Sequence, residues 1–191
     1  EKAIAAKERG NSHYKNKEFD EALSAYDEAI KWDPTNMTYH LNKASVFVEQ
    51  RKLEECFKSC DDALEIGRAN HASYEQIAKV YERKGNAYMK LDRLEEAIVD
   101  YRKAQIEHRT SEVDERIRTA EKSLKTRAEL AYRDPQRAVE AKDAGNVKFK
   151  AGDFAGAVAD YTDAIKRDPE NAIYYLNRAT AYTKLMDFGR A

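Results

Sequence analysis

The sequence of 191 residues has few of the residues that break helices or cross-link chains: three prolines, seven glycines and two cysteines. Scarce proline and a charged fraction of 36% favour long helices with solvated faces. Two cysteines, Cys56 and Cys60, exclude a disulfide framework. We therefore expect a reducing compartment, the cytoplasm.

Long apolar runs and an excess of positive charge are also missing. No run approaches the roughly 18 apolar residues that a membrane-spanning helix needs, and the first ten residues do not resemble a secretory signal. The formal net charge of −1 argues against general affinity for nucleic acid, which requires clustered lysine and arginine. We expect neither a membrane nor a nucleic acid as partner.

What the sequence does contain is a repeat of itself. Residues 7–44 align without a gap with residues 142–179, at an offset of 135 (142 minus 7). The matching residues include three polar ones: Lys7, Asn11 and Asn42 correspond to Lys142, Asn146 and Asn177. Because a scaffold alone needs no recurring lysine and asparagines, their recurrence points to a function.

Small and aromatic residues recur with a shorter period. Units of this pattern start at Ala3, Met37, Ala78, Ala138 and Ala172. Their spacing, with Pro34 and Pro169 closing two units, resembles the 34-residue tetratricopeptide (TPR) repeat. This resemblance implies an all-α TPR solenoid, a right-handed superhelix of antiparallel helix pairs whose first helices line a concave groove.

Two spacings depart from 34 residues. The units at Met37 and Ala78 start 41 residues apart, so we expect the later helix to begin near Asn70, with Gly67 ending the preceding one. The units at 78 and 138 start 60 residues apart, and the region 111–132 has the pattern of one amphipathic capping helix. We therefore predict a three-repeat array with its capping helix over 1–132, then the first one and a half repeats of a second array over 133–191.

Groove positions of the first array carry three cations and three amides, a set that suits carboxylates. Lys7, Asn11, Asn42, Lys79 and Arg83 resemble the dicarboxylate clamp of chaperone-binding TPR domains. The wider sequence is similar to the central region of the Hsp-organising co-chaperone (Hop) family. That resemblance implies an adaptor that binds the tail of heat shock protein 90, which ends in Met-Glu-Glu-Val-Asp.

Within the resemblance, the residues of the clamp have separate roles. Lys7, Asn11, Asn42 and Lys79 would hold the terminal Asp of the peptide, and Arg83 would help with that Asp or the preceding Glu. Weaker candidates for upstream peptide residues are Tyr14, Thr38, Glu49, Gln76 and Asn86. Lys142, Asn146 and Asn177 form an incomplete second clamp, whose remaining cations would come from a sixth unit.

The sequence is compatible with several alternatives. The tail of heat shock protein 70 also ends in Glu-Glu-Val-Asp, and the array could be a scaffold for a folded partner or the targeting domain of a larger enzyme. No catalytic motif is visible, so we expect no enzyme activity from these residues. Cys56 and Cys60 occupy packing positions, and a zinc site needs about four ligands. We expect no metal and no cofactor.

Overall fold

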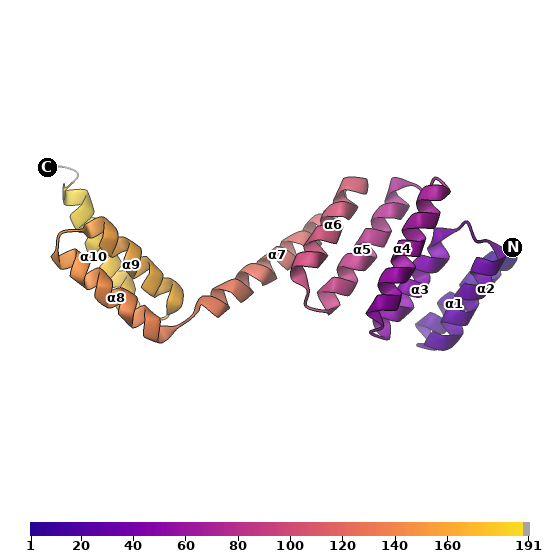
Figure 1. Cartoon of the computed structure of the whole chain (residues 1–191), viewed down its shortest axis with the longest axis horizontal. Coiled ribbons are helices and arrows are strands. Elements are labelled where there is room, and N and C mark those ends of the chain that lie inside the picture. The colour runs from indigo at the N-terminus through magenta and orange to yellow at the C-terminus, as the bar shows by residue number, and fades with distance from the viewer. Residues whose placement is uncertain (189–191) are drawn as a thin grey trace. The chain divides into compact units, whose positions relative to one another are not determined.

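The computed structural model describes residues 1–188, and every regular element in this range is an α-helix (Figure 1). In chain order the helices are α1 Lys2–Lys15, α2 Phe19–Trp32, α3 Met37–Glu49, α4 Leu53–Ala69, α5 Tyr74–Lys90, α6 Leu94–Glu107, α7 Ser111–Tyr132, α8 Pro135–Lys150, α9 Phe154–Arg167 and α10 Ala172–Phe188. The all-α prediction is confirmed, and the predicted helix over 111–132 is found with those bounds.

The chain divides into two compact units. Unit 1 is Glu1–Leu124, and unit 2 comprises the residues from Lys125 onward. The division falls within α7, and Tyr132 at the end of that helix donates a hydrogen bond to Asp163 of α9, also in unit 2, at 2.5 Å. The repeat pattern predicts a different boundary, between residues 132 and 133, where the first TPR array and its capping helix end. That boundary remains a prediction.

Helix pairs build unit 1. α1 packs on α2, α3 on α4 and α5 on α6, and α2 and α4 also contact the first helix of the following pair. A tyrosine from the second helix lies against a glycine of the first: a Cβ atom added at Gly10 would lie 2.5 Å from Tyr26 Cε1, and one at Gly85 2.5 Å from Tyr101 Cε1. Any larger residue there would push the helices apart.

Each complete pair turns through one residue in the left-handed backbone region. These residues are Lys17 (φ 62°), Arg51 (φ 59°), Asp92 (φ 61°) and Gly152 (φ 84°). Each lies 14 positions after the first residue of its unit, since 17 minus 3, 51 minus 37, 92 minus 78 and 152 minus 138 all equal 14. The backbone thus repeats in the register that the side chains predict.

The seven additional residues between the second and third units lie differently from the prediction. Gly67 does not end α4 but is buried inside it, and a Cβ atom there would lie 2.5 Å from Met37 Sδ. The helix ends at Ala69, and α5 begins at Tyr74 rather than near Asn70. Ser73 caps α5 in a capping box with Gln76, which fixes that later start.

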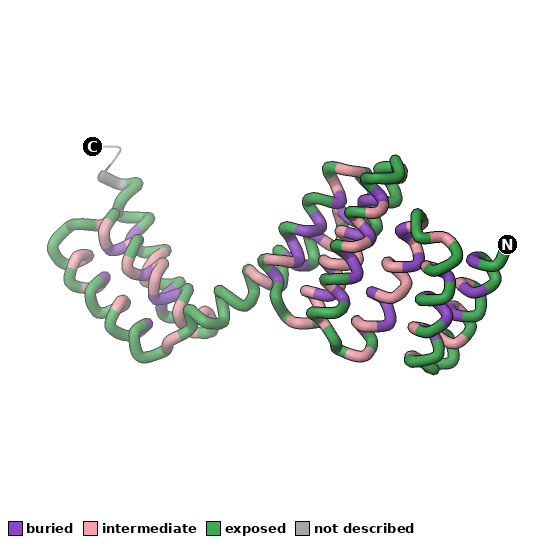
Figure 2. The backbone as a smooth tube through the Cα atoms, turned by 45° about the vertical axis from the view of Figure 1, so that its right-hand side comes forward, coloured by how far each residue is buried: buried purple, intermediate pink, exposed green. Residues whose placement is uncertain are grey.

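The first half of α7 covers the last helix pair of unit 1. Val113 and Ile117 are buried against Tyr101 and Ala104 of α6 and Ala78 of α5. Residues 125–133 are all exposed (green in Figure 2). The apolar stripe therefore ends where the helix leaves the repeats that it caps.

Unit 2 repeats the packing on a smaller scale. α8 packs on α9 and α9 on α10, and a Cβ atom at Gly145 would lie 2.7 Å from Tyr161 Cε1. Asp134 caps α8 by accepting from the Arg137 amide, with Pro135 in the first turn. Several large apolar side chains on α10 are exposed: Ile173, Tyr175, Leu176, Tyr182, Leu185 and Met186.

Candidate functional site

The predicted clamp residues come from the first helices of three successive pairs. Lys7 and Asn11 lie one turn apart on α1, Asn42 lies on α3, and Lys79 and Arg83 lie one turn apart on α5. A spacing of four residues places Lys7 and Asn11 on one face of α1, and likewise Lys79 and Arg83 on one face of α5. The candidate site is thus assembled from segments more than 30 residues apart in the chain.

Asn11 is the centre of a hydrogen-bond network between α1, α2 and α3. Its Oδ1 accepts from the Tyr26 hydroxyl at 2.8 Å and from Asn42 Nδ2 at 3.2 Å. Burial, followed by the nearby Tyr14, raises the pKa of Tyr26 to about 12, so its hydroxyl remains a donor. With Oδ1 engaged twice, the amide orientation is fixed and Asn11 Nδ2 is available to donate to a ligand.

The same network occurs in two other helix pairs. The Tyr161 hydroxyl donates to Asn146 Oδ1 at 2.8 Å and the Tyr101 hydroxyl to Asn86 Oδ1 at 2.7 Å. Asn177 Nδ2 also donates to Asn146, at 3.4 Å, as Asn42 does to Asn11. Sequence reasoning missed the tyrosines, although each follows its asparagine by 15 residues.

The three cations of the predicted clamp differ in their surroundings. Within residues 1–188, Lys7 and Arg83 form no ion pair, and the buried Arg83 Nε has no hydrogen-bond partner. Lys79 Nζ contacts Glu75 Oε1 at 2.6 Å, with both side chains 56% exposed. The hydrogen bond from Lys79 lowers the pKa of Glu75. Among the described residues no hydrogen bond joins these cations to Asn11 or Asn42, so of the predicted clamp residues only the two asparagines are hydrogen-bonded to each other.

The weaker candidates have local roles. Tyr14 packs against Phe19 with ring centroids 6.2 Å apart, and the Thr38 amide donates to Asn36 at the start of α3. Glu49 accepts from Lys90 Nζ at 2.6 Å, which links α3 to α5. The Gln76 side chain accepts from the Ser73 amide at 2.9 Å as part of the capping box, so its oxygen is already used.

The incomplete second clamp lies in unit 2. Asn146 and Asn177 are in contact, but Lys142 Nζ is paired with the neighbouring Asp143 at 2.8 Å. Lys142 on α8 and Asn177 on α10 therefore repeat the placement of Lys7 on α1 and Asn42 on α3. The described part of unit 2 contains no counterpart of α5, which carries Lys79 and Arg83.

Metal binding and membrane insertion find no support among the described residues. Cys56 and Cys60 are both fully buried in the core of α3, α4 and α5. No group of three or more His, Cys, Asp or Glu side chains in residues 1–188 is arranged to hold a metal ion. None of the helices in this range has the length and hydropathy required to cross a membrane.

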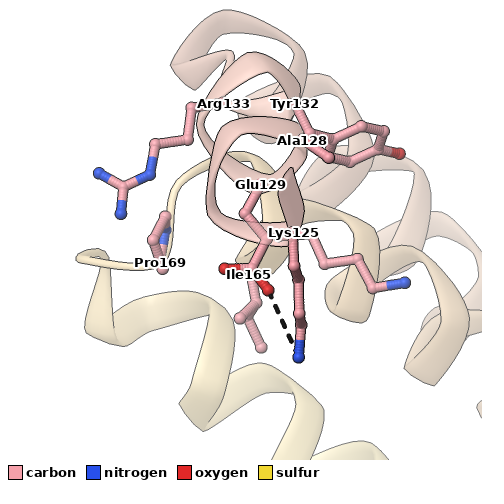
Figure 3. A pocket seen from close by; sticks show the side chains of 8 residues that line it. Lys125, Ala128, Glu129, Tyr132, Arg133, Ile165 and Pro169 are labelled. Atoms are coloured by element: carbon pink, nitrogen blue, oxygen red, sulfur yellow. Dashed lines mark ion pairs between the residues drawn. The ribbon is translucent and has the colours of Figure 1, made fainter. Parts of the chain in front are cut away.

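A cavity of about 710 Å³ lies in unit 2, away from the predicted site residues (Figure 3). The end of α7, the end of α9 and the turn after α9 line it, with Ile165 and Pro169 on one side and Tyr132 and Ala128 on the other. The ion pair between Lys125 and Glu129, at 3.8 Å, lies at its edge. None of the predicted clamp residues lines this cavity.

Comparison with family models identifies the repeat. The tetratricopeptide repeat matches residues 3–36 and 78–106, and the TPR repeat matches residues 145–185. Two of these matches begin at Ala3 and Ala78, where the sequence pattern starts its units. The class is therefore a TPR solenoid, as predicted.

Individual relatives indicate which family of TPR proteins the chain resembles. Stress-induced-phosphoprotein 1 of Caenorhabditis elegans is 45% identical over 99% of this chain and 59% of its own length. The Hsp70-Hsp90 organizing protein of Triticum aestivum is 38% identical over 96% of this chain and 32% of its own. A solved structure described as the TPR2AB-domain:pHSP90-complex of yeast Sti1 is 41% identical, covers 98% of this chain and 72% of that one, and superimposes with a TM-score of 0.90.

The chain belongs to the Sti1/Hop family of Hsp70-Hsp90 organizing proteins. It spans 59% of the nematode relative and about a third of the wheat relative. The family resemblance read from the sequence is confirmed.

Proposed function

We propose that this chain is a co-chaperone adaptor module whose unit 1 binds the extended acidic C-terminus of heat shock protein 90, of the Met-Glu-Glu-Val-Asp type. The observation that carries the proposal is the Asn11–Asn42 contact, which Tyr26 orients, together with Lys7 on α1 and Arg83 on α5, which form no ion pair within residues 1–188. The yeast relative that was solved as a pHSP90 complex supports the choice of ligand. Binding, rather than catalysis, is the proposed role, and the cytoplasm is the proposed location.

Each clamp residue has a chemical task in this proposal. Asn11 and Asn42 donate neutral hydrogen bonds to the carboxylates of the terminal Asp, while Lys7 and Lys79 supply charge. Arg83, with its planar fork, holds that Asp or the preceding Glu. Lys79 must first leave Glu75, and an exposed ion pair of this kind is worth little. The exchange therefore does not oppose binding strongly.

The remaining candidates would contact residues upstream of the terminus. Tyr14 offers an apolar ring beside Asn11, and Glu49 and Asn86 continue the faces of α3 and α5 that carry Asn42 and Arg83. Thr38 lies one turn before Asn42. Gln76 would have to give up its capping bond to contact a ligand.

A second candidate ligand is the tail of heat shock protein 70. The network of Tyr161, Asn146 and Asn177 in unit 2 favours a second carboxylate site. The wheat relative is named for both heat shock protein 70 and heat shock protein 90. Among the described residues of unit 2, that site has no counterparts of the cations that Lys79 and Arg83 supply in unit 1. We propose that unit 2 alone binds such a tail far more weakly than unit 1 does.

Calorimetric titration with a Met-Glu-Glu-Val-Asp peptide, as the free acid and as the C-terminal amide, tests the clamp. A short ligand that is held mainly by charge should bind with an affinity on the order of micromolar, and added salt should weaken it. The amide should bind at least about tenfold more weakly because it removes one charge and one acceptor oxygen. Equal binding of acid and amide would contradict the proposal.

Lys79→Ala should abolish most binding while the melting temperature stays unchanged. Lys58→Ala is the matched control, because Lys58 is an exposed lysine on α4, a second helix of a pair. If both variants bind alike, the site lies elsewhere. In that case a scaffold for a folded partner becomes the better explanation of unit 1.

A further inference from the structure

The capping helix α7 places a guanidinium next to a candidate ligand-binding residue. Arg116 Nη1 donates to Asn86 Oδ1, the oxygen that also accepts from the Tyr101 hydroxyl. Burial raises the pKa of Tyr101, which keeps its hydroxyl a donor. Asn86 is thus held by one group from its own pair and one from the following helix.

This arrangement has the geometry of the other two networks. In each, an asparagine oxygen accepts from a tyrosine 15 residues later and from a side chain on the next first helix: Asn42 for Asn11, and Asn177 for Asn146. For Asn86 the second donor is Arg116, which follows it by 30 residues. Asn42 and Asn177 each follow their asparagine by 31 residues. The capping helix therefore behaves as the first helix of a fourth pair, with a cation where the repeats have an amide.

No acidic side chain in the described part of the chain balances the charge of Arg116. Arg116 is partly buried, and within the described residues it forms no ion pair. Arg116 lowers the pKa of Tyr101 and the nearby Glu82 raises it. Glu82 and Arg116 do not form an ion pair with each other. A guanidinium has five N–H donors, and among the described residues that of Arg116 has hydrogen-bond partners only in Asn86 and Tyr101.

Arg116 also lies beside the predicted clamp. Asn86, to which it is bonded, follows Arg83 by three residues on α5, a spacing at which side chains are neighbours. Arg83 likewise has no ion pair in residues 1–188, and its buried Nε has no hydrogen-bond partner. Within the described residues, the guanidinium groups of Arg83 and Arg116, one three residues from Asn86 and one bonded to it, thus lack a carboxylate partner.

We propose that Arg116 is a further ligand-binding residue, which holds a side-chain carboxylate of the acidic peptide upstream of its terminal Asp. This inference rests on the proposed function of unit 1. The terminal Asp occupies Lys7, Asn11, Asn42 and Lys79, so a glutamate side chain is the remaining carboxylate for Arg116. Its bond to Asn86 holds the guanidinium in place before the ligand arrives, which limits the entropy lost on binding.

The test pairs a protein change with a ligand change. Arg116→Gln in the full 191-residue chain removes the charge and retains an amide donor for Asn86. It should weaken binding of the Met-Glu-Glu-Val-Asp peptide by roughly fivefold, as for a charge-assisted contact. With a peptide in which both Glu residues are Gln, the same substitution should change the affinity less than twofold. An equal loss with both peptides would overturn the inference.

Two further variants separate charge from structure. Arg118→Gln removes the same charge from an exposed position two residues along α7, on another face of the helix, and should leave both affinities unchanged. Arg116→Lys keeps the cation and should bind the parent peptide within about twofold of the original chain. If Arg116→Lys loses as much affinity as Arg116→Gln, a positive charge at this position does not support binding, and the inference is wrong.

The outcome also distinguishes this inference from the proposed function. If the original chain binds neither the free acid nor the amide, the carboxylate clamp itself has failed. If it binds only the free acid, and the Arg116 variants bind every peptide as the original chain does, only the role of Arg116 is refuted. Melting temperatures of all variants show whether α7 still caps unit 1.

Discussion

Asn42 Nδ2 donates to Asn11 Oδ1 at 3.2 Å, and this contact joins the first helices of two neighbouring repeats. It positions two amide groups on one face before any ligand is present. Because Tyr26 occupies the other lone pair of the same oxygen, the Asn11 amide cannot flip without losing two hydrogen bonds. The site is therefore preorganised by Asn42, which is itself a proposed ligand-binding residue, and by Tyr26, which is not.

Tyr26→Phe should separate this support from direct binding. Removing the hydroxyl breaks one partly buried hydrogen bond, which should lower the free energy of unfolding by about 1 kcal/mol. It also leaves Asn11 less well oriented, so affinity for the acidic peptide should fall by about three- to tenfold. Urea unfolding and calorimetric titration measure the two effects.

Tyr161→Phe is the matched control for Tyr26→Phe. Its hydroxyl donates to Asn146 at 2.8 Å, the same length as the bond from Tyr26 to Asn11. We expect a similar loss of stability in unit 2 and no change in the affinity of unit 1. Equal effects of the two variants on affinity would mean that the orientation of Asn11 is irrelevant to binding.

Glu75→Gln tests the exchange that Lys79 must undergo. The pair at 2.6 Å is exposed, and Glu75 competes with the ligand for Lys79. Removing the carboxylate should strengthen peptide binding by roughly two- to threefold, and the gain should shrink in high salt. Glu65→Gln, an exposed change on α4, should leave the affinity unchanged. If Glu75→Gln binds the peptide more weakly than the original chain, Glu75 positions Lys79 for binding rather than competing with the ligand for it.

The repeat register made most of the fold predictable. Small residues and tyrosines at fixed positions in the repeat specify which helices touch, as Gly10 with Tyr26 and Gly85 with Tyr101 confirm. Gly67 shows the limit of this reasoning. A glycine in a helical pattern predicts either an end or a close contact, and only the tertiary position of Met37 decides between them.

The candidate site was predictable in its residue types but not in its contacts. Asn11 and Asn42 meet because each repeat presents the same face, which the 31-residue spacing encodes. The spacing does not encode which carboxylate a long side chain selects, so the pairing of Lys79 with Glu75 was not foreseen. Arg116 was missed because α7 is not a repeat, and its register differs by one residue from that of Asn42.

The turns between paired helices give a prediction about stability alone. Lys17, with φ 62°, adopts a backbone conformation that costs a residue with a Cβ atom roughly 1–2 kcal/mol, whereas glycine adopts it freely. Lys17→Gly should therefore raise the free energy of unfolding of unit 1 by about 0.5–1 kcal/mol, once the greater chain entropy of glycine is included. Urea unfolding measures this change.

Gly152→Ala provides the reverse change at the equivalent turn of unit 2. Its φ is 84°, and a Cβ atom there would meet nothing within 4 Å, so any effect arises from the backbone rather than from crowding. We expect it to lower the free energy of unfolding of unit 2 by about 1 kcal/mol. Because neither turn contributes a predicted clamp residue, peptide affinity should stay the same in both variants. Shifts of the same sign in Lys17→Gly and Gly152→Ala would show that backbone strain at this position does not control the stability of the helix pairs.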